Sequence, residues 1–435
     1  MAKWTQRFQA LIPADAQDLP VTNGGVTQSA ARRSLVELRR WGAAPVPLPY
    51  QSELLTGIVG AAQERRTTGL LALPTGAGKT VTAAWIGLRL LASAAGNKSS
   101  SQCVWLAPQK ELLYQAAEAF ERAWWSGNGP DSLDLRILES SKDLSVSERP
   151  SVLFLTPQMG LRIRDRLAQT PYDCLFFDEA HHAAGNAFAD LWLYLRAALE
   201  PRLALGLSAT PYRATSEQNL ELRNAFDGRI FTAKSLGNRP VETLVQERVL
   251  AEPEFRQIPG VASYLRAKGP EDQRKLQALV ADPERWGATV ACLRELELGR
   301  CVVFCLSRAH GTMLTKHLRR EGISAEYVDG RTHGAERLAI FERFRDDATR
   351  VLVSVSLLIE GVDCPAAEAA LLTYPTASPT RLRQMIGRVL RGPAVGGTEK
   401  ARIWAFEGSQ AWLTRHSLDT DYRFSGWDVT AFPSG

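Results

Sequence analysis

Short apolar segments alternate with amphipathic helical patterns along most of this 435-residue chain, and this alternation restricts the possible folds more than any other feature. Where strands and helices alternate, each helix carries the chain back across the sheet, so that successive strands run parallel. The first series predicts strands at 70–73, 103–106, 151–155, 174–177 and 203–207, with helices in the gaps, such as 110–124. The second series predicts strands at 301–305, 325–328, 351–354, 369–373 and 402–406, and helices at 309–320, 335–344 and 379–390.

The two series predict an α/β protein with two mainly parallel sheets, each covered by helices on both faces. A chain of this length holds about two or three domains. Pro45, Pro47 and Pro49 mark a boundary after an N-terminal extension. The periodicity weakens between 212 and 286, and we interpret part of this region as the connection between domains. The expected domains are an extension at 1–44, a first domain at 45–250, and a second at 251–435 that ends in a short C-terminal extension.

The composition is that of a globular, mildly basic protein. The formal net charge is +5 and the isoelectric point about 8.9, which permits nucleic-acid binding without requiring it. No apolar run reaches the roughly 20 residues of a membrane span and the N-terminus has no signal-peptide core, so we expect a cytoplasmic protein without membrane partners. The six cysteines show no paired C-x-x-C spacing and are interpreted as small buried residues, in preference to metal ligands or disulfides.

A glycine-containing turn, Leu73-Pro74-Thr75-Gly76-Ala77-Gly78-Lys79-Thr80, joins the first predicted strand to a helical pattern. Glycines let such a turn curl so that backbone N–H groups point inward, toward the partially positive start of the helix. Lys79 would then reach the outer phosphates of a nucleotide, and the Thr80 hydroxyl a magnesium ion. The match is to the Gly-Lys-Thr half of the usual pattern, because Leu73 stands where that pattern has its first glycine. A structural glycine-rich turn is the alternative interpretation.

Two adjacent acids, Asp178 and Glu179, follow the predicted strand at 174–177. Ligands of open parallel sheets bind at the carboxyl ends of strands. At such an end Asp178 can hold a magnesium ion, directly or through a water, and Glu179 can orient and deprotonate the water that attacks a terminal phosphate. Paired acids at a strand end also occur as helix N-caps. The Gly-Lys-Thr loop upstream favours the hydrolytic interpretation.

With these motifs in this order, the chain resembles the superfamily 2 helicases that carry a DEAH box, here Asp178-Glu179-Ala180-His181. The similarity covers most of residues 48–408. It implies two RecA-like domains with an ATP cleft between them, and ATP and Mg²⁺ as cofactors. Within the superfamily, the stretches 361–365 and 392–393 are most similar to the restriction-subunit and excision-repair branch, whose members act on DNA.

The resemblance also implies a role for each motif. Nucleotide contacts would come from Gln51, Thr75, Gly76, Ala77, Gly78, Lys79, Thr80, Gly361 and Asp363, and magnesium ligands would be Thr80 and Asp178. The catalytic residues would be Lys79, Glu179, Arg388 and Arg391, and the residues that couple hydrolysis to movement would be His181, Ser208, Thr210 and Gln384. Nucleic-acid contacts would come from Pro108, Gln109, Thr156, Pro157 and Arg308. Arg388 and Arg391 lie three apart on the helix predicted at 379–390, so that both can face one site.

The function implied by the resemblance is that of an ATP-dependent DNA helicase or double-strand DNA translocase in repair, restriction or phage defence. If one domain supplies the loop and the acids while the other supplies the arginines, hydrolysis requires domain closure, which couples the nucleotide to movement. An RNA helicase is one alternative. The other is a scaffold subunit of a larger DNA-processing complex with protein partners, although a scaffold would not need Glu179 as a base.

Further aromatic and basic residues have two interpretations. Trp124-Trp125, Arg32-Arg33 and Arg39-Arg40 could supply stacking and phosphate contacts to a nucleic acid. A buried aromatic pair and a solvated helix face are the favoured interpretation.

Overall fold

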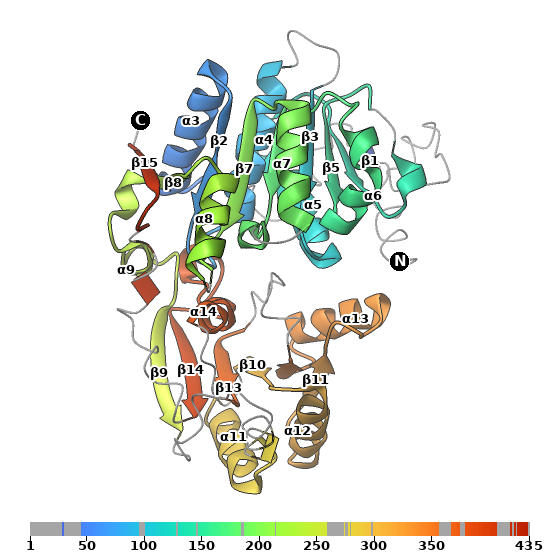
Figure 1. Ribbon diagram of the computed structural model, residues 1–435. Coiled ribbons are helices and arrows are strands. Elements are labelled where there is room, and N and C mark those ends of the chain that lie inside the picture. Colours follow the sequence, from blue (N-terminus) through green and yellow to red (C-terminus); the bar gives the residue numbers. More distant parts are fainter. Residues whose placement is uncertain are drawn as a thin grey trace. The chain divides into compact units, whose positions relative to one another are not determined.

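The computed structural model describes residues 28–29, 45–94, 101–127, 129–144, 147–183, 187–213, 215–258, 274, 277–278, 280–296, 299–355, 367–374, 379–406, 418–419, 422 and 424–433. The chain forms two compact units (Figure 1). The first unit takes in the chain up to residue 73, then 78–237 and 423–435. The second takes in 238–422, and the four residues 74–77 group with it. Each unit is built around its own sheet.

The sheet of the first unit has the strand order β1-β4-β5-β3-β6-β7-β2-β8-β15. Its strands are β1 (Gln28–Ser29), β2 (Thr67–Ala72), β3 (Gln102–Leu106), β4 (Asp134–Ile137), β5 (Ser151–Leu155), β6 (Cys174–Phe177), β7 (Leu203–Ser208), β8 (Arg229–Ala233) and β15 (Asp428–Phe432). All neighbouring pairs are parallel except β1 with β4. The strands predicted for the first series are confirmed, with bounds that differ by a few residues.

Helices connect these parallel strands. They are α3 (Pro49–Glu64), α4 (Lys79–Ala94), α5 (Lys110–Trp125), α6 (Pro157–Leu167), α7 (Ala187–Leu199) and α8 (Ser216–Ala225), with the 3-10 turns η2 (Ser141–Asp143), η3 (Ala180–His182) and η4 (Lys234–Leu236). Trp105 of β3 forms the centre of an aromatic cluster, stacked on Phe176 with ring centroids 5.3 Å apart and met edge-on by Phe120 at 5.6 Å. Trp124 is buried and its indole N–H donates to the Pro130 carbonyl, which confirms the interpretation as a core aromatic.

Two strands of the first sheet fall in regions with weak sequence periodicity. β8 lies in the region that we had interpreted partly as a connection, and β15 lies in the expected C-terminal extension. Asp428 to Phe432 pair in parallel with Arg229 to Ala233, and the Phe432 ring lies 5.6 Å from Phe231. The region between 212 and 286 is therefore more structured than predicted, because its strands complete both sheets.

The sheet of the second unit has the order β11-β12-β10-β13-β14-β9, and every pair in it is parallel. Its strands are β9 (Glu252–Ile258), β10 (Cys301–Phe304), β11 (Ala325–Val328), β12 (Val351–Ser354), β13 (Ala369–Leu372) and β14 (Lys400–Phe406). Its helices are α9 (Pro240–Gln246), α11 (Pro283–Glu295), α12 (Arg308–Arg320), α13 (Gly334–Arg345) and α14 (Pro379–Gly387), with the 3-10 turn η5 (Pro393–Val395). The predicted class, two parallel α/β sheets, is confirmed.

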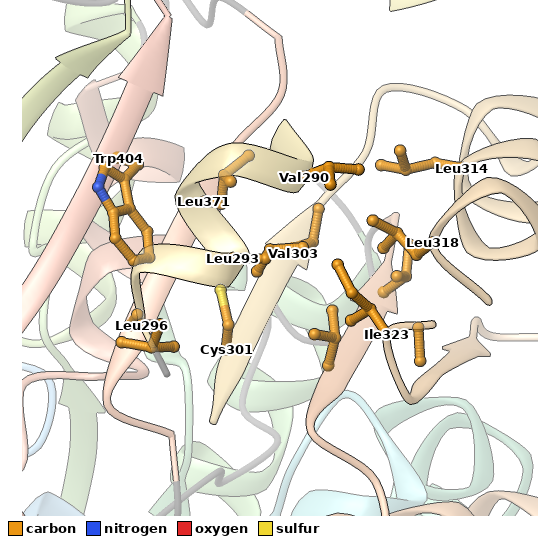
Figure 2. Packing of buried hydrophobic residues seen from close by; sticks show 14 of the residues in the cluster. Val290, Leu293, Leu296, Cys301, Val303, Leu314, Leu318, Ile323, Leu371 and Trp404 are labelled. Atoms are coloured by element: carbon orange, nitrogen blue, oxygen red, sulfur yellow. The ribbon is translucent and has the colours of Figure 1, made fainter. Parts of the chain in front are cut away.

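Figure 2 shows the core of the second unit, where strand and helix side chains interdigitate. Val303 of β10 and Leu371 of β13 meet Val290 and Leu293 of α11, and Leu318 of α12 closes the cluster. Cys301 and Cys305 are fully buried here, as are Cys103 and Cys174 in the first unit, which confirms the interpretation of these cysteines as core residues. Within the described parts of the chain, every helix is too short or too polar to span a bilayer.

Candidate nucleotide site and strand-end loops

The predicted phosphate loop runs from the end of β2 at Ala72 to the start of α4 at Lys79. Gly76 and Gly78 have φ angles of +89° and +73°, a region that side chains with a Cβ rarely enter. The Ala77 N–H donates to the Pro74 carbonyl at 3.0 Å, which closes the turn. The loop therefore has the curled backbone expected of a phosphate cradle, and Lys79 and Thr80 are the first residues of the helix that follows.

Gln51 of α3 lies against this loop. Its side-chain carbonyl accepts the Leu48 N–H at 2.9 Å in a capping box, and Gln51 is 4% exposed. A Cβ placed on Gly78 would lie only 2.7 Å from Gln51 Nε2. The glutamine predicted to contact the nucleotide is thus held in place by its own helix start and directed at the loop.

The two acids stand at the end of β6, as predicted. Both are buried, Asp178 with 3% and Glu179 with 8% of its surface exposed. The Asp178 carboxylate accepts the Glu179 N–H at 2.9 Å. Glu179 adopts the left-handed conformation, with φ 49° and ψ 49°, a strain of roughly 1–3 kcal/mol that proteins retain mainly at functional sites. This backbone turn lets two consecutive residues project acidic side chains from one strand end.

His181 connects the acids to the next strand. Its Nδ1 lies 3.3 Å from Glu179 Oε2 and 3.5 Å from the Ser208 hydroxyl at the end of β7. The Ser208 oxygen in turn accepts the Thr210 N–H at 3.1 Å. The structure therefore brings together Glu179, His181, Ser208 and Thr210, which the sequence resemblance assigned to catalysis and coupling.

His182 was not among the predicted site residues. Its ring lies over that of His181, with centroids 4.4 Å apart, and burial lowers the pKa of His182 to about 4. The second histidine is therefore neutral at physiological pH. Its position directly after the DEAH sequence is the only signal that could have marked it.

The donor set suits a nucleotide with Mg²⁺. Backbone N–H groups and the Lys79 ammonium favour phosphate oxygens at a helix start. The Asp178 carboxylate and the Thr80 hydroxyl are hard oxygen ligands of the kind that Mg²⁺ prefers. Asp178 belongs to β6, which pairs with β7, and β7 pairs with β2, from which the phosphate loop leaves.

The loops predicted to touch nucleic acid leave the same edge of the first sheet. Pro108 and Gln109 follow β3, and Thr156 and Pro157 follow β5, its neighbour in the sheet. Thr156 caps α6 by accepting the Met159 N–H at 3.3 Å, and Pro157 is the first residue of that helix. Since β3 also pairs with β6, these loops flank the acids. Their contact with a nucleic acid stays a prediction.

The arginine-finger motif corrects one expectation. The helix predicted at 379–390 ends at Gly387, so Arg388 and Arg391 do not share a helix. Arg391 forms an antiparallel β-bridge with Leu250. The Gly392 N–H donates to the Val249 carbonyl, so the chain is extended here and not helical. Gln384 lies on α14 and is buried. The role of both arginines stays a prediction.

Arg308 is held by a residue that the sequence analysis missed. Its Nε donates to Asp329 at 2.5 Å, and Asp329 also accepts the Tyr327 hydroxyl at 2.9 Å and the Arg331 N–H at 2.8 Å. The Asp-Gly sequence at 329–330 is a common turn signal and could have marked the position. Arg308 is about half exposed, and its contact with nucleic acid stays a prediction. Gly361 and Asp363 lie outside the described residues.

Two family models match the chain. The model of the res subunit of type III restriction enzymes matches residues 45–213, and that of the helicase conserved C-terminal domain matches residues 287–393. The chain belongs to the superfamily 2 helicases. This agrees with the resemblance found in the motifs.

Relatives of this helicase span both units. IRC3 of Saccharomyces cerevisiae is 25% identical over 364 residues, which cover 81% of this chain and 50% of IRC3. Helicase 22 of a Sulfolobus islandicus filamentous virus is 26% identical and covers 74% of this chain and 58% of its own length. The chain thus spans about half the length of the curated relatives it matches.

Solved structures show the same fold. The HsdR subunit fragment of a type I restriction enzyme from Vibrio vulnificus matches with a TM-score of 0.60 and 20% identity, over 90% of this chain and 70% of that one. Dbp5 of S. cerevisiae, solved with RNA and ADP BeF3, matches with a TM-score of 0.56 and 17% identity, over 91% and 95%. These likenesses show the fold, two parallel-sheet α/β domains of the RecA-like type, which is the architecture implied by the sequence resemblance.

Proposed function

We propose that this helicase is an ATP-dependent motor on DNA, a helicase or double-strand translocase in repair, restriction or phage defence. One observation carries the proposal: a curled phosphate loop, a buried acid pair and the His181–Ser208 contact occupy one strand-end edge of the first sheet. The names of the relatives support it, since IRC3 carries the name of an ATP-dependent helicase and the V. vulnificus match that of a restriction subunit.

The residues of the proposed nucleotide site would have different roles in hydrolysis. The loop backbone and Lys79 would hold the phosphates of ATP, and Gln51 would contact its base. Thr80 and Asp178 would hold Mg²⁺, which neutralises charge on the phosphate oxygens when bound. Glu179 would orient the attacking water and take its proton, a contribution of about 10² to 10⁴ in rate. Burial of Glu179 excludes other waters from this carboxylate.

Coupling to movement would start at His181. The Nδ1 of His181 is within reach of both Glu179 and Ser208. A movement of the imidazole toward one of these residues therefore weakens its contact with the other, which would couple the catalytic carboxylate to the end of β7. We propose that Arg388, Arg391 and Gln384 of the second unit complete the site when the domains close, and that Gly361 and Asp363 contribute to it.

DNA is the proposed substrate, with RNA as the alternative. The resemblance to the restriction and excision-repair branch supports DNA. The likeness to Dbp5, which was solved with RNA, is a likeness of fold at 17% identity and does not favour RNA. A scaffold role fits less well, because the strained and buried Glu179 would serve no purpose in it.

ATP turnover with and without nucleic acid tests the proposal. The native chain should hydrolyse ATP faster with DNA than with matched RNA, Lys79→Ala should lose nucleotide binding, and Glu179→Gln should bind ATP but turn it over at least about 10²-fold more slowly. Equal rates for all three proteins with and without DNA would refute the motor. A larger stimulation of ATP turnover by RNA than by DNA would identify RNA as the substrate instead.

A further inference from the structure

A row of three buried polar residues crosses the amino ends of three neighbouring strands in the first unit. Asp134, Ser151 and Gln102 are the first residues of β4, β5 and β3. They pair in register, Asp134 with Ser151 and Ser151 with Gln102, across parallel strands about 4.8 Å apart. Residues paired in this way point their side chains to the same face of the sheet. The three side chains are therefore neighbours on one face.

Each of these residues has an oxygen without a hydrogen-bond partner in the part of the chain that the structure describes. These atoms are Oδ1 of Asp134, Oγ of Ser151 and Oε1 of Gln102, and all three are closed to solvent. Ser151 and Gln102 have no exposed surface, and Asp134 is 8% exposed. Buried polar atoms are nearly always paired, so three such oxygens in adjacent residues indicate a ligand that they share.

Ser147 connects the two ends of the row. Its hydroxyl donates to Asp134 Oδ2 at 2.7 Å, and its carbonyl accepts the Gln102 Nε2–H at 3.3 Å. The Ser147 hydroxyl oxygen also accepts the Arg149 N–H at 3.2 Å, which holds the serine in its turn. One end of each outer side chain is thus engaged by Ser147. The other ends, Oδ1 and Oε1, are left for a ligand beside Ser151, which stands between them in the row.

The charge of Asp134 has no cationic partner in the described chain. Its carboxylate forms no ion pair with any described basic residue, and an ionised buried carboxylate is costly unless it is paired. Asp173, another acid at this edge, already accepts the Ser101 hydroxyl at 2.6 Å and the Gln102 N–H at 3.3 Å. A singly charged cation would balance Asp134. A divalent ion would leave excess positive charge on the face that also carries Arg136, two residues along β4.

We propose that Asp134 Oδ1, Ser151 Oγ and Gln102 Oε1 bind a sodium ion at the amino edge of the first sheet. Carboxylate, hydroxyl and amide oxygens are the donors that hard cations prefer. The three oxygens are closed to a molecule the size of water, whereas a dehydrated sodium ion is smaller than water and than potassium. The ion ties β4, β5 and β3 together at the edge opposite to the nucleotide site, so the inference is independent of the proposed function.

Unfolding temperatures in two salts test this site. Without nucleotide or nucleic acid, the native chain should unfold about 3–6 °C higher in sodium chloride than in choline chloride of equal ionic strength, at about ten times the dissociation constant for sodium. Choline is too large to enter. Asp134→Asn keeps an acceptor for the Ser147 hydroxyl but removes the charge, so its two unfolding temperatures should be equal. Asp131→Asn, the same change at an exposed residue nearby, is the matched control and should keep the native difference.

Ser151→Ala is a second test that leaves the charge of the site intact. It removes one ligand, so the sodium concentration at the midpoint of the stabilisation should rise about 10-fold or more, the loss that follows even when an outer-shell partner is removed. In choline chloride this variant should unfold no lower than the native chain, because the change removes a buried hydroxyl that has no partner. A purely structural serine would instead lower the unfolding temperature equally in both salts.

Three results would overturn the proposal. Equal unfolding temperatures of the native chain in the two salts would mean that no sodium ion binds, and that a water molecule or a proton satisfies these oxygens. A sodium effect of native size in both Asp134→Asn and Ser151→Ala would place the ion elsewhere. Stabilisation by potassium or calcium chloride without any by sodium chloride would contradict the identity of the ion.

Discussion

The side-chain amide of Gln51 occupies the space that a Cβ atom on Gly78 would need, with Nε2 only 2.7 Å from that position. Two requirements thus meet at Gly78, because its backbone is also left-handed, with φ +73°. The left-handed backbone is a requirement of the loop itself, and the missing Cβ is a requirement of Gln51 on the preceding helix. The glycine links the residue proposed to contact the base of the nucleotide with the loop proposed to hold its phosphates.

Gly78→Ala should abolish nucleotide binding. The methyl group would displace Gln51 and oppose the left-handed backbone, which together cost about 1–3 kcal/mol or more in the loop. Binding of a fluorescent ATP analogue measures the effect. Gly60→Ala is the matched control: it lies on the same helix as Gln51, and beyond that helix's own backbone no described atom lies within 4 Å of the new Cβ, so the change should stabilise the helix by about 0.5–1 kcal/mol with unchanged binding. Native affinity in Gly78→Ala would contradict the steric argument.

His181 and Ser208 should act as one unit. His181→Ala and Ser208→Ala should each lower the ratio of ATP turnover with DNA to turnover without it. The double variant should lower this ratio no further than the more impaired of the two single variants. Residues in contact are non-additive, whereas distant ones add. Combining His181→Ala with Ser93→Ala, a serine whose hydroxyl donates to the Leu90 carbonyl within α4, supplies the additive control. Additive losses for His181 with Ser208 would show that their contact has no part in coupling.

Stability should fall as the pH drops from about 6.5 toward 4. Burial lowers the pKa of both His182 and His310 to about 4, so the folded chain resists protonation in a range where the unfolded chain, with histidine pKa values near 6.5, takes up protons. The free energy of unfolding therefore decreases by on the order of 2 kcal/mol for each of the two histidines between pH 7 and 5. Urea unfolding at the two pH values measures it. His310→Gln should flatten the dependence, and an identical pH profile for that variant would rule out His310 as its source.

Asp419 should stabilise the second unit by capping the start of α9, a helix far from it in the sequence. Its carboxylate accepts the Val241 N–H at 2.7 Å and the Glu242 N–H at 3.3 Å at the start of α9, and the residue is 6% exposed. Asp419→Ala should lower the free energy of unfolding by about 1–2 kcal/mol, because these N–H groups lose their acceptor. Asp419→Asn keeps one acceptor and should lose less. Urea unfolding followed by tryptophan fluorescence measures both, and equal losses would argue against the cap.

Local patterns were sufficient for much of this fold. The strands at 151–155, 174–177 and 351–354 have the predicted bounds, because a fully buried parallel strand is a short apolar run that helices interrupt on each side. The Gly-Lys-Thr loop and the acid pair were visible for a similar reason, since their chemistry requires particular residue types next to one another.

The region between 212 and 286 shows where local patterns fail. β8, whose residues 229–233 mix buried and half-buried positions, gains its place from β2 on one side and β15 on the other. The helix predicted to reach 390 stops at 387, because the Gly392 N–H donates to the Val249 carbonyl and the Leu390 carbonyl accepts the Ala251 N–H instead. Pairings between segments so far apart leave no periodic signal in either segment.

By itself, the sequence determined the two α/β sheets, the family and the residue types of the nucleotide site, because apolar periodicity and motif spacing are properties of neighbouring residues. Only the tertiary structure decided the left-handed turn at Glu179 and the contact of His181 with Ser208. Each of these depends on which strand ends meet at a sheet edge and on what is buried there. These features are determined by solvent exclusion and hydrogen-bond geometry, which arise only when distant segments pack.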